Sequence, residues 1–461
     1  MSKNLLSYSA YLPHNVLSRA ALSEAVGGNR GPGGRSVAGF DEDSITMGVA
    51  AAGAIASDAA VGDPVFFATA SPPFLDKTNA TVVGAALGGD QWRMTVDLAG
   101  LRSGYAALKL ASEVGGLAVM ADHRGGRTGS SAEADGGDGA AAFVFGDGGD
   151  PVATVLASSS AATEVMDVWR APGAENALAS EERFSQHVLS RGIRKVVAEL
   201  NARSGATTAP TYSLVSTPQR RLALSSASAL GDVGGVETLA AHRADTGYCG
   251  AADIGVLLAR TLDSARSGDT ILVVNAVGSV DALLLQVLRD GPGNDDWNEG
   301  LAARRSLSYV EFLTWSGRIT REPARRPDKP AAAAAPAARN ADWKYGLVGG
   351  RCTKCGKVYL PAHRVCGGCG SVDSFTPHTV ARRAGSVVAV ATDAVTDSPA
   401  PPNEVAVVDF DGGGRLTMEV ADAAPALMRV GDRIEPVFRR AYEVGGLPNY
   451  FWKARRTNGA L

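Results

Sequence analysis

The sequence predicts a layered α/β protein that continues into a zinc ribbon and a small β-barrel. Three observations support this fold class. Strand-like and helix-like segments alternate from residue 1 to about residue 321, which is the pattern of layered α/β domains. Two C-x-x-C pairs follow after residue 340, and paired knuckles of this kind are typical of zinc ribbons. Short alternating strands, separated by Gly, Pro and Asp, then run to the end of the chain, as in small antiparallel barrels.

The first half, about residues 1–160, alternates the two kinds of segment. Strands are expected at 5–13, 64–71, 116–124 and 139–148, and helices at 44–59 and 81–88. The helix at 44 follows the acidic residues 41–43, which are suitable N-terminal caps. Residues 95–111 read as a strand, a turn around Gly100 and an Ala/Leu-rich helix. A strand-to-helix turn is where α/β enzymes often place a nucleophile.

The second half, about residues 161–321, repeats this plan. An amphipathic helix is expected at 184–205, a strand at 211–218, and a helix, turn and strand over 250–278. Two halves of similar size and plan predict a duplicated unit. Residues 322–340 are rich in Pro and Ala and predict a semi-extended linker. A helical Ala run is the alternative, opposed by Pro330 and Pro336.

The zinc ribbon is expected over residues 341–375. Cys352 and Cys355 form the first pair, and Cys366 and Cys369 form the second. Four thiolates fill a tetrahedral Zn²⁺ site and leave no open position for catalysis, so we expect zinc with a structural role only. This clustering favours a metal in a reducing compartment over disulfides.

Residues 376–461 predict an OB-like barrel, a fold that often binds nucleic acid. Basic residues lie close to aromatic ones there: Arg439, Arg440, Lys453, Arg455 and Arg456 are near Phe438, Tyr442, Tyr450, Phe451 and Trp452. Acidic residues are also frequent, and the whole chain has 45 basic and 48 acidic residues with a net charge of −3. We therefore expect no nucleic-acid partner.

The same composition favours a cytoplasmic protein with no membrane association. No signal peptide is visible at the N-terminus, and no apolar run reaches about 18 residues. The length of 461 residues and a hydrophobic content of 45% are sufficient for more than one domain, each with a large core.

Several ordered stretches resemble the hydroxymethylglutaryl-CoA synthase family of the thiolase superfamily. The resemblance covers about residues 1–320 and is carried by 36–47 (SVAGFDEDSITM), 67–81, 96–108 (VDLAGLRSGYAAL), 121–146, 214–218 (LVSTP) and 247–279. It implies a duplicated αβαβα thiolase fold, a CoA thioester as substrate and at least a homodimer.

The C-terminal part resembles the zinc-ribbon and OB-fold accessory proteins that accompany thiolases and these synthases. The matching runs are 345–371, 384–392 and 430–440. This resemblance implies a partner of the thiolase type (acetyl-CoA acetyltransferase-like), with which CoA thioesters are exchanged. Fusion of both parts in one chain supports both resemblances.

The catalytic groups of the synthase family are replaced in this chain. Where that family has its Cys nucleophile, His and Glu, the matching residues are Arg102, Ser216 and Ala70, and its active-site Asn corresponds to Tyr248. Attack on a thioester requires a thiolate, which the permanently cationic Arg102 cannot replace. The resemblance therefore does not extend to the acetyl-enzyme route.

Four residues remain candidates for catalysis, each with an alternative. Arg102 is either a clamp for a substrate oxygen or one side of a salt bridge, with Asp97, Glu133 or Asp135 as the expected partners. Tyr248 is either a general acid/base or a space-filling residue, and tyrosines are thought to serve in this way in the related steroid-side-chain aldolases. Cys249 is either a core residue or a relocated nucleophile. Ser216 lacks a visible His partner.

His123 follows a strand end and is either catalytic or a solvated loop residue. The leading hypothesis is a cysteine-independent enzyme of the acyltransferase or C–C lyase type, which makes or breaks a C–C bond beside a thioester by aldol or Claisen chemistry. The alternative is a catalytically silent subunit that organises a Cys-bearing thiolase and channels CoA intermediates. The acyl group and the direction of reaction stay open.

Overall fold

The computed structural model describes residues 2–205, 208–293, 296–319, 321–322, 330–331, 333–395, 398–422 and 427–457. The chain forms two compact units. The first comprises Met1–Ala38, Asp43–Ala80 and Gln91–Phe312, and the second comprises Gly39–Glu42, Thr81–Asp90 and Leu313–Leu461. The boundaries that composition indicates at residues 321, 340 and 375 stay predictions.

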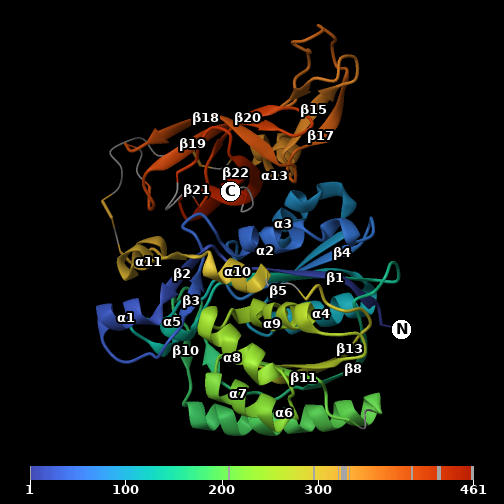
Figure 1. Cartoon of the computed structure of the whole chain (residues 1–461), viewed down its shortest axis with the longest axis vertical. Coiled ribbons are helices and arrows are strands. Elements are labelled where there is room, and N and C mark those ends of the chain that lie inside the picture. The colour runs from blue at the N-terminus through green and yellow to red at the C-terminus, as the bar shows by residue number, and fades with distance from the viewer. Residues whose placement is uncertain are drawn as a thin grey trace. The chain divides into compact units, whose positions relative to one another are not determined.

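A nine-stranded sheet forms the frame of the first unit, in the order β11-β12-β13-β8-β1-β7-β6-β4-β5 (Figure 1). Its strands are β1 (Asn4–Tyr11), β4 (Pro64–Thr69), β5 (Met94–Ala99), β6 (Gly116–Asp122), β7 (Gly139–Gly146), β8 (Ala153–Ala161), β11 (Tyr212–Ser216), β12 (Thr270–Ala276) and β13 (Val280–Val287). β1 pairs with β7 along its length but with β8 only through Leu5 and Ala153. The sheet therefore consists of two halves that meet at β1.

The two halves repeat one plan. In the first, β4 and β6 are parallel, and β7 and β1 then pair antiparallel. In the second, β11 and β12 are parallel, and β13 and β8 then pair antiparallel. The first half has one further strand, β5, parallel to β4 at the edge of the sheet. The predicted duplication is confirmed, with one strand fewer in the second half among the described residues.

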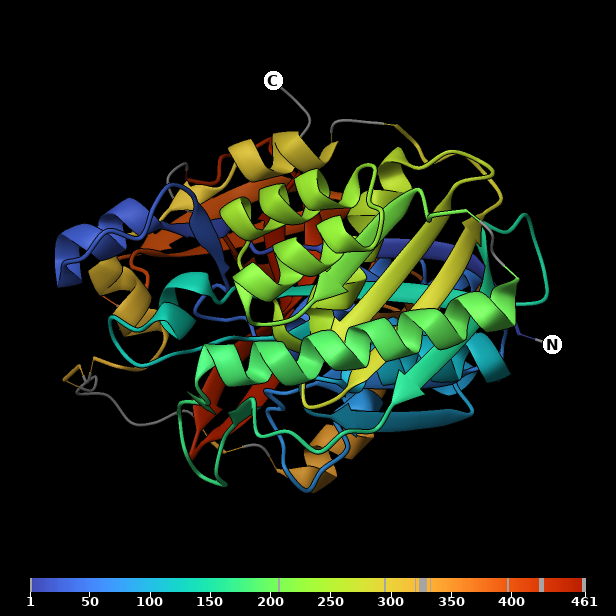
Figure 2. The ribbon, with the colours of Figure 1, turned by 90° about the horizontal axis from the view of Figure 1, so that it is seen from below.

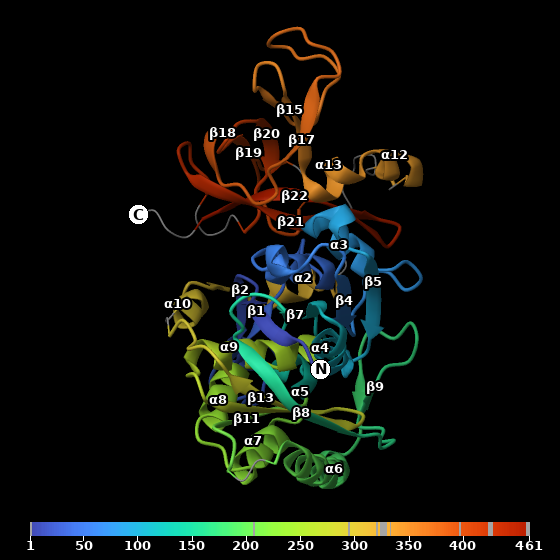
Figure 3. The same cartoon turned by 90° about the vertical axis from the view of Figure 1, so that its right-hand side faces the viewer.

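Helices lie between and outside the sheet halves (Figures 1 and 3). The principal ones are α2 (Ser44–Gly53), α4 (Ser103–Val114), α6 (Glu182–Ser204), α7 (Arg220–Ala229), α8 (Gly235–Asp245) and α9 (Asp253–Ser264). α4 packs on β4 and β6, while α9 packs on β7, β1 and β11, so these two helices form the central layer. α2 covers the first half from outside, and α6 lies across β8 and β13, as the long green helix in Figure 2 shows. The predicted αβαβα layering is confirmed.

Local sequence explains where these helices begin and how deeply they are buried. Asp43 caps α2, since its Oδ1 accepts from the Thr46 N–H at 3.0 Å while the Thr46 hydroxyl accepts from the Asp43 N–H at 2.8 Å. This is a reciprocal capping box. α9 is apolar on almost every face, and all of Asp253–Ala259 is buried, as a helix between two sheets requires.

Shorter elements complete the chain before residue 321. They are β2 (Asn15–Ser18), α1 (Arg19–Val26), β3 (Gly34–Val37), η1 (Ala56–Asp58), α3 (Ala80–Leu87), η2 (Gly89–Gln91), α5 (Ser131–Asp135), β9 (Val168–Trp169), β10 (Leu178–Ala179), η3 (Gly250–Ala252), α10 (Asp296–Ala302), β14 (Arg305–Ser306) and α11 (Tyr309–Trp315). No described helix has the length and apolar character needed to span a membrane.

The second unit contains the predicted ribbon and barrel, and both are confirmed. The ribbon sheet has the order β16-β15-β17, and the barrel sheet has the order β20-β19-β18-β21-β22. The strands are β15 (Val348–Cys352), β16 (Val358–Tyr359), β17 (Phe375–Thr379), β18 (Gly385–Asp393), β19 (Asn403–Phe410), β20 (Arg415–Glu419), β21 (Arg433–Val444) and β22 (Leu447–Arg456). A bridge between Val420 and Ala454 links the end of β20 to β22, the other edge strand. The small barrel is thereby partly closed.

The prediction of a semi-extended linker is wrong over part of residues 322–340. α12 (Ala334–Arg339) and α13 (Ala341–Gly346) are helical. Pro336 is the third residue of α12, within the first turn, where a missing N–H leaves no intrahelical hydrogen bond unmade. The end of the Ala run, Ala334 and Ala335, therefore joins Pro336 in the first turn of a short helix. Residues 323–329 and 332 lie outside the described residues.

Five of the basic and aromatic residues of the barrel are buried within the second unit, namely Arg439, Lys453, Phe438, Tyr450 and Trp452, whereas Arg440, Arg455 and Arg456 are partly exposed. The Arg439 Nη1 lies 2.7 Å from a Glu42 oxygen, and the Lys453 Nζ lies 2.9 Å from an Asp41 oxygen. The Phe438 ring packs against Tyr450 and Trp452, with centroids 5.5 and 5.3 Å away. These residues form part of the core of the unit.

Candidate active site and metal centre

The four predicted catalytic residues lie around the starts of the two central helices. Arg102 precedes α4, Ser216 ends β11, and Tyr248 and Cys249 precede the turn η3 that leads into α9. The two helix starts are in close contact, because a Cβ on Gly104 would lie 1.9 Å from the Ala251 carbonyl oxygen. Only glycine fits at this position. Carboxyl ends of strands and helix N-termini are where α/β folds place ligands.

Arg102 forms a two-pronged salt bridge with Asp281 of β13. Its Nε and Nη2 each lie 2.6 Å from an Asp281 oxygen. The Asp281 side chain is fully buried, whereas 44% of the Arg102 side chain is exposed. Hydrogen bonding to Asp281 raises the pKa of Arg102. The pair is neutral overall, which explains how an arginine is tolerated at a helix N-terminus.

The salt-bridge interpretation of Arg102 thus holds, but the expected partners were wrong. Asp97 instead accepts from the Asn79 and Ala80 N–H groups, each at 2.7 Å. Asp135 pairs with Arg19 at 3.0 Å, and Glu133 accepts from the Tyr309 hydroxyl at 3.0 Å. Since Arg102 uses only Nε and Nη2 in its salt bridge, its Nη1 makes no hydrogen bond among the described residues.

Asp253, at the start of α9, is the centre of a buried polar cluster. Its oxygens accept hydrogen bonds from the following donors: Ser216 Oγ (2.8 Å), His242 Nε2 (2.9 Å), Arg243 Nη2 (3.1 Å) and Cys249 N (3.1 Å). Burial alone would raise the pKa of Asp253, but Arg243 and the hydrogen bonds bring it below its usual value. Burial lowers the pKa of His242, so its ring is neutral at pH 7.

Tyr248 is almost fully buried and its hydroxyl has no partner among the described residues. The side chain is 4% exposed, and the hydroxyl oxygen makes no hydrogen bond. The Arg243 guanidinium lies over the ring, 4.9 Å from its centroid. Burial strongly raises the pKa of the Tyr248 phenol. The hydroxyl is therefore neutral, and what it offers to a ligand is a hydrogen-bond donor rather than a base.

Cys249 has the environment of a core residue. It is fully buried, and its Sγ lies 3.9 Å from the Gly247 carbonyl oxygen. Burial raises the pKa of the Cys249 thiol well above its usual value, which suppresses the reactive thiolate. Cys249, His242 and Asp253 are close enough to share a metal ion. However, the four hydrogen bonds already occupy both Asp253 oxygens, and Arg243 adds a cation beside them.

Ser216 donates its hydroxyl hydrogen to Asp253 and not to an imidazole. His242 reaches the other oxygen of the same carboxylate. The arrangement therefore lacks the direct Ser–His contact of an activated serine nucleophile. Of the four predicted residues, Ser216 and Cys249 hydrogen-bond to Asp253, Tyr248 stacks under Arg243, and Arg102 has a separate partner.

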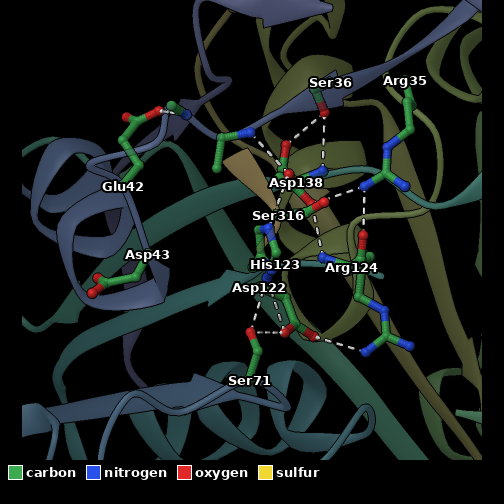
Figure 4. Close-up of polar contacts among 12 residues, drawn as sticks. Arg35, Ser36, Glu42, Asp43, Ser71, Asp122, His123, Arg124, Asp138 and Ser316 are labelled. Atoms are coloured by element: carbon green, nitrogen blue, oxygen red, sulfur yellow. Dashed lines mark hydrogen bonds and ion pairs between the residues drawn. The ribbon is translucent and has the colours of Figure 1, made fainter. Parts of the chain in front are cut away.

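A second polar network lies at the end of β6 (Figure 4). The Ser71 hydroxyl donates to Asp122 Oδ1 at 2.5 Å, and the Ala251 N–H of η3 donates to Asp122 Oδ2 at 2.9 Å. The Arg124 N–H donates to Asp138 at 2.7 Å. The His123 side chain is 42% exposed, with its Nε2 3.8 Å from Asp138 Oδ2. It is thus a half-exposed residue beside a buried carboxylate.

Sequence reasoning missed several buried polar residues of this region, among them Asp253, Asp281, Asn275, His242 and Arg243. Asn275 lies between Ser216 and Asp281 in the strand register. It is 2% exposed, and its Nδ2 has no partner among the described residues. For Asn275 the available signal was a polar residue at the carboxyl end of a strand, whereas Asp281 begins β13 and Asp253 begins α9. Nothing in the spacing indicates which partner each residue takes.

The four ribbon cysteines form a metal centre in the second unit. Their sulfurs lie within 4.8 Å of one another, with 3.7 Å between Cys352 and Cys369 and 3.4 Å between Cys355 and Cys366. Tetrahedral Zn–S bonds of about 2.3 Å require sulfurs about 3.8 Å apart. Each knuckle turns back on itself, as the Gly356 N–H bonds to the Cys352 carbonyl at 2.9 Å. The donor set therefore fits zinc.

Comparison with known proteins links both parts of the chain to known families. Residues 344–373 match the family model of the ChsH2 rubredoxin-like zinc ribbon domain. The DUF35 domain-containing scaffold protein of Methanothermobacter thermautotrophicus is 31% identical over 121 residues, which is 25% of this chain and 90% of that protein. The hydroxymethylglutaryl-CoA synthase of Pyrococcus furiosus is 28% identical over 293 residues, covering 59% of this chain and 82% of the relative.

Solved structures show the same fold. A crystal structure of HMG-CoA synthase complexed with CoA superposes with a TM-score of 0.61 at 20% identity, covering 71% of this chain and 93% of that one. A structure of MvaS in complex with 3-hydroxy-3-methylglutaryl coenzyme A gives a TM-score of 0.58 at 16% identity, covering 72% of this chain and 96% of that one. Both family resemblances seen in the sequence are confirmed, and the thiolase-like fold with them.

Proposed function

We propose that this chain, whose C-terminal part belongs to the DUF35 domain-containing scaffold family, is an enzyme of acyl-CoA metabolism. Its N-terminal part has the fold of hydroxymethylglutaryl-CoA synthases. It makes or breaks a C–C bond beside the thioester, by aldol or Claisen chemistry, without a cysteine nucleophile. The substrate is a CoA thioester. Zinc in the ribbon has a structural role.

The observation that carries this proposal is the Tyr248 hydroxyl, which is buried, neutral and without a partner. A buried hydroxyl that lacks a hydrogen bond costs about 1–3 kcal/mol, and such groups gather at functional sites. A substrate oxygen that accepts from Tyr248 would remove this cost. The thioester oxygen acquires negative charge as an enolate forms, so the hydrogen bond strengthens during the reaction.

The remaining groups around the helix starts fit the same chemistry. In the cleavage direction, a 3-hydroxyacyl thioester loses its hydroxyl proton to a base, the bond between its second and third carbons breaks, and the electron pair passes into the thioester as an enolate. Half-exposed His123 supplies the base, since imidazole is the commonest proton acceptor in enzymes. Tyr248 donates to the enolate oxygen. The free Nη1 of Arg102 offers a further donor, held in place by Asp281.

Partners follow from the same relatives. The DUF35 relatives are named scaffold proteins, which supports a complex with a thiolase of the acetyl-CoA acetyltransferase type. Thiolase-fold proteins commonly pair through a sheet edge, and the exposed edge strand β5 supports a homodimer of this chain.

A second candidate is a silent subunit that organises a Cys-bearing thiolase and channels CoA intermediates. The tight pairing of Arg102 with Asp281 favours it, because the residue at the family's nucleophile position is committed to a structural contact. The two candidates differ in whether turnover depends on Tyr248.

The test is turnover by the purified chain, alone and with its co-purified thiolase, of acetyl-CoA, acetoacetyl-CoA and a series of 3-hydroxyacyl-CoA esters, followed by mass spectrometry. We expect Tyr248→Phe to lower kcat about 100-fold or more, as loss of a hydrogen-bond donor to a developing oxyanion does. Tyr212→Phe is the control and should leave the rate unchanged, because Tyr212 begins β11 at the end away from Ser216. Full turnover by Tyr248→Phe contradicts the enzyme proposal. A thiolase rate that needs this chain but not Tyr248 establishes the silent subunit.

A further inference from the structure

Two arginines of the second unit point at the same small space beside a glycine turn. The turn joins β19 to β20 and consists of Gly412, Gly413 and Gly414, with φ of 83°, 104° and 101°. A Cβ on Gly412 would lie 3.2 Å from Arg383 Nη1 and 3.9 Å from Arg351 Nη2. Arg351 comes from β15 of the ribbon, and Arg383 from the segment between β17 and β18.

No described carboxylate neutralises either arginine. Arg351 donates to the Gly412 carbonyl at 2.6 Å and to the Gly356 carbonyl at 3.4 Å, and Arg383 donates through Nε to the Thr379 carbonyl at 3.0 Å. Both Nη groups of the exposed Arg383 are unused among the described residues. The neighbouring carboxylate, Asp411, already forms a two-pronged ion pair with Arg433.

The other exposed arginines nearby provide a contrast. Arg415 pairs with both oxygens of Asp409 at 2.6 and 2.7 Å, and Arg364 pairs in the same way with Asp373 at 2.9 and 2.6 Å. Arg351 and Arg383 differ from these two arginines in having no carboxylate partner among the described residues. Unpaired like charges repel each other, so an arrangement that holds them together favours a bound anion.

His378 of β17 adds a buried group to the same place. The His378 Nε2 lies 3.5 Å from Arg351 Nη2, and His378 is 9% exposed. Burial first, and then the charges of Arg351 and Arg383, lower the pKa of His378. The imidazole is thus neutral, and it can accept a hydrogen bond from Arg351 without adding a third cation.

We infer that Arg351, Arg383 and the Gly412–Gly414 turn form a binding site for a phosphate ester. Guanidinium groups match the geometry of phosphate oxygens with paired N–H donors. A phosphate monoester or a pyrophosphate carries the two negative charges that two unpaired arginines balance, whereas a single carboxylate does not. The missing Cβ of Gly412 lets a ligand approach the backbone beside Arg383 Nη1, whereas the Val358 and Leu360 side chains pack against Gly413 and Gly414.

This inference deepens the proposed function, on which its choice of coenzyme A as the ligand rests. Coenzyme A carries a pyrophosphate and a 3′-phosphate, so the site would hold the nucleotide end of an acyl-CoA. The phosphate chemistry itself depends only on the second unit. A phosphate ester other than coenzyme A is the other source of the same ligand chemistry.

The experiment measures binding to the zinc-loaded full chain by calorimetry. The probes are coenzyme A, dephospho-coenzyme A, which lacks the 3′-phosphate, and inorganic phosphate. We expect Arg383→Ala to weaken coenzyme A binding about tenfold, and Arg383→Glu to weaken it further, because one charge-assisted hydrogen bond is lost and then replaced by repulsion. Arg383→Lys should restore part of the affinity. Arg415→Ala is the matched control and should bind as the unaltered chain does.

Each outcome decides between the sources. If the Arg383 variants weaken binding of coenzyme A but not of dephospho-coenzyme A, the 3′-phosphate occupies the site. If they weaken binding of both, the pyrophosphate occupies it. Sensitivity for inorganic phosphate alone supports a phosphate site that another ligand uses. Equal affinities for all probes in Arg383→Glu and the unaltered chain, or an equal loss in Arg415→Ala, overturn the inference. Unchanged zinc content and unfolding midpoint verify that the variants fold.

The same data separate this inference from the proposed function. Coenzyme A binding that requires Arg383, in a chain that turns over no acyl-CoA, leaves the phosphate site standing and removes the enzyme. Turnover of acyl-CoA that requires Tyr248 but is unchanged in Arg383→Glu leaves the enzyme standing and removes the phosphate site.

Discussion

The pairing of Arg102 with Asp281 shows how one buried carboxylate fixes the residue at the family's nucleophile turn. Arg102→Ala would leave the fully buried Asp281 without a counter-ion, and breaking a pair with a buried partner costs about 3 kcal/mol. We expect a loss of this order in the free energy of unfolding, measured with urea at pH 7.

Asp281→Asn in the Arg102→Ala background is the control for this prediction. The amide has nearly the same shape but no charge, so most of the lost stability should return. Arg102→Ala as stable as the unaltered chain, or a double variant no more stable than Arg102→Ala, would show that Asp281 is satisfied by other groups.

At the residue scale, sequence reasoning identified positions better than partners. The motif placed Arg102 at a strand-to-helix turn, and the structure has it there. Its partner Asp281 lies on β13, and the strand brings it close only once the sheet has formed. In the same way, Tyr248, Cys249 and Ser216 were singled out, whereas Asp253, which accepts hydrogen bonds from two of them, was not. Partnership depends on tertiary contacts that no local pattern encodes.

At the scale of elements, the alternation of apolar segments predicted the long strands and helices well, because each buries one face or both. The error fell on α12 (Ala334–Arg339), where prolines were taken to exclude a helix. The helix forms because Pro336 lies in its first turn, where a proline is tolerated. The ribbon was predictable from spacing alone, because four thiolates in two knuckles have one common structural use.

Zinc should stabilise the ribbon, whose three strands β15, β16 and β17 have few residues to form a core of their own. We expect one zinc ion per chain by elemental analysis. Cys366→Ser should lose it and unfold the ribbon, because metal binding supplies about 10–16 kcal/mol to the folding of such sites. Hydrogen exchange of the ribbon amides is the second readout. Cys249→Ala, in the first unit, should retain its zinc, and a full zinc content in Cys366→Ser contradicts the assignment.

At the scale of the whole molecule, the duplicated plan was visible as a repeat of segments, while its asymmetry was not. The first half adds β5 beside β4, and the second half ends at β11. β5 has a pattern of exposed and half-buried residues, with Met94 48% exposed. An edge strand of this kind offers unpaired N–H and C=O groups to another chain.

We accordingly expect a homodimer formed through β5, with twice the chain mass of 47.3 kDa in analytical ultracentrifugation. Met94→Lys places a charge on this edge, and charged edge strands resist pairing. The dissociation constant should rise about tenfold or more, equivalent to about 1.4 kcal/mol. Val233→Lys, at a 79% exposed residue between α7 and α8, is the control and should leave the mass unchanged. A monomeric unaltered chain, or a Met94→Lys dimer of full strength, would exclude β5 as the interface.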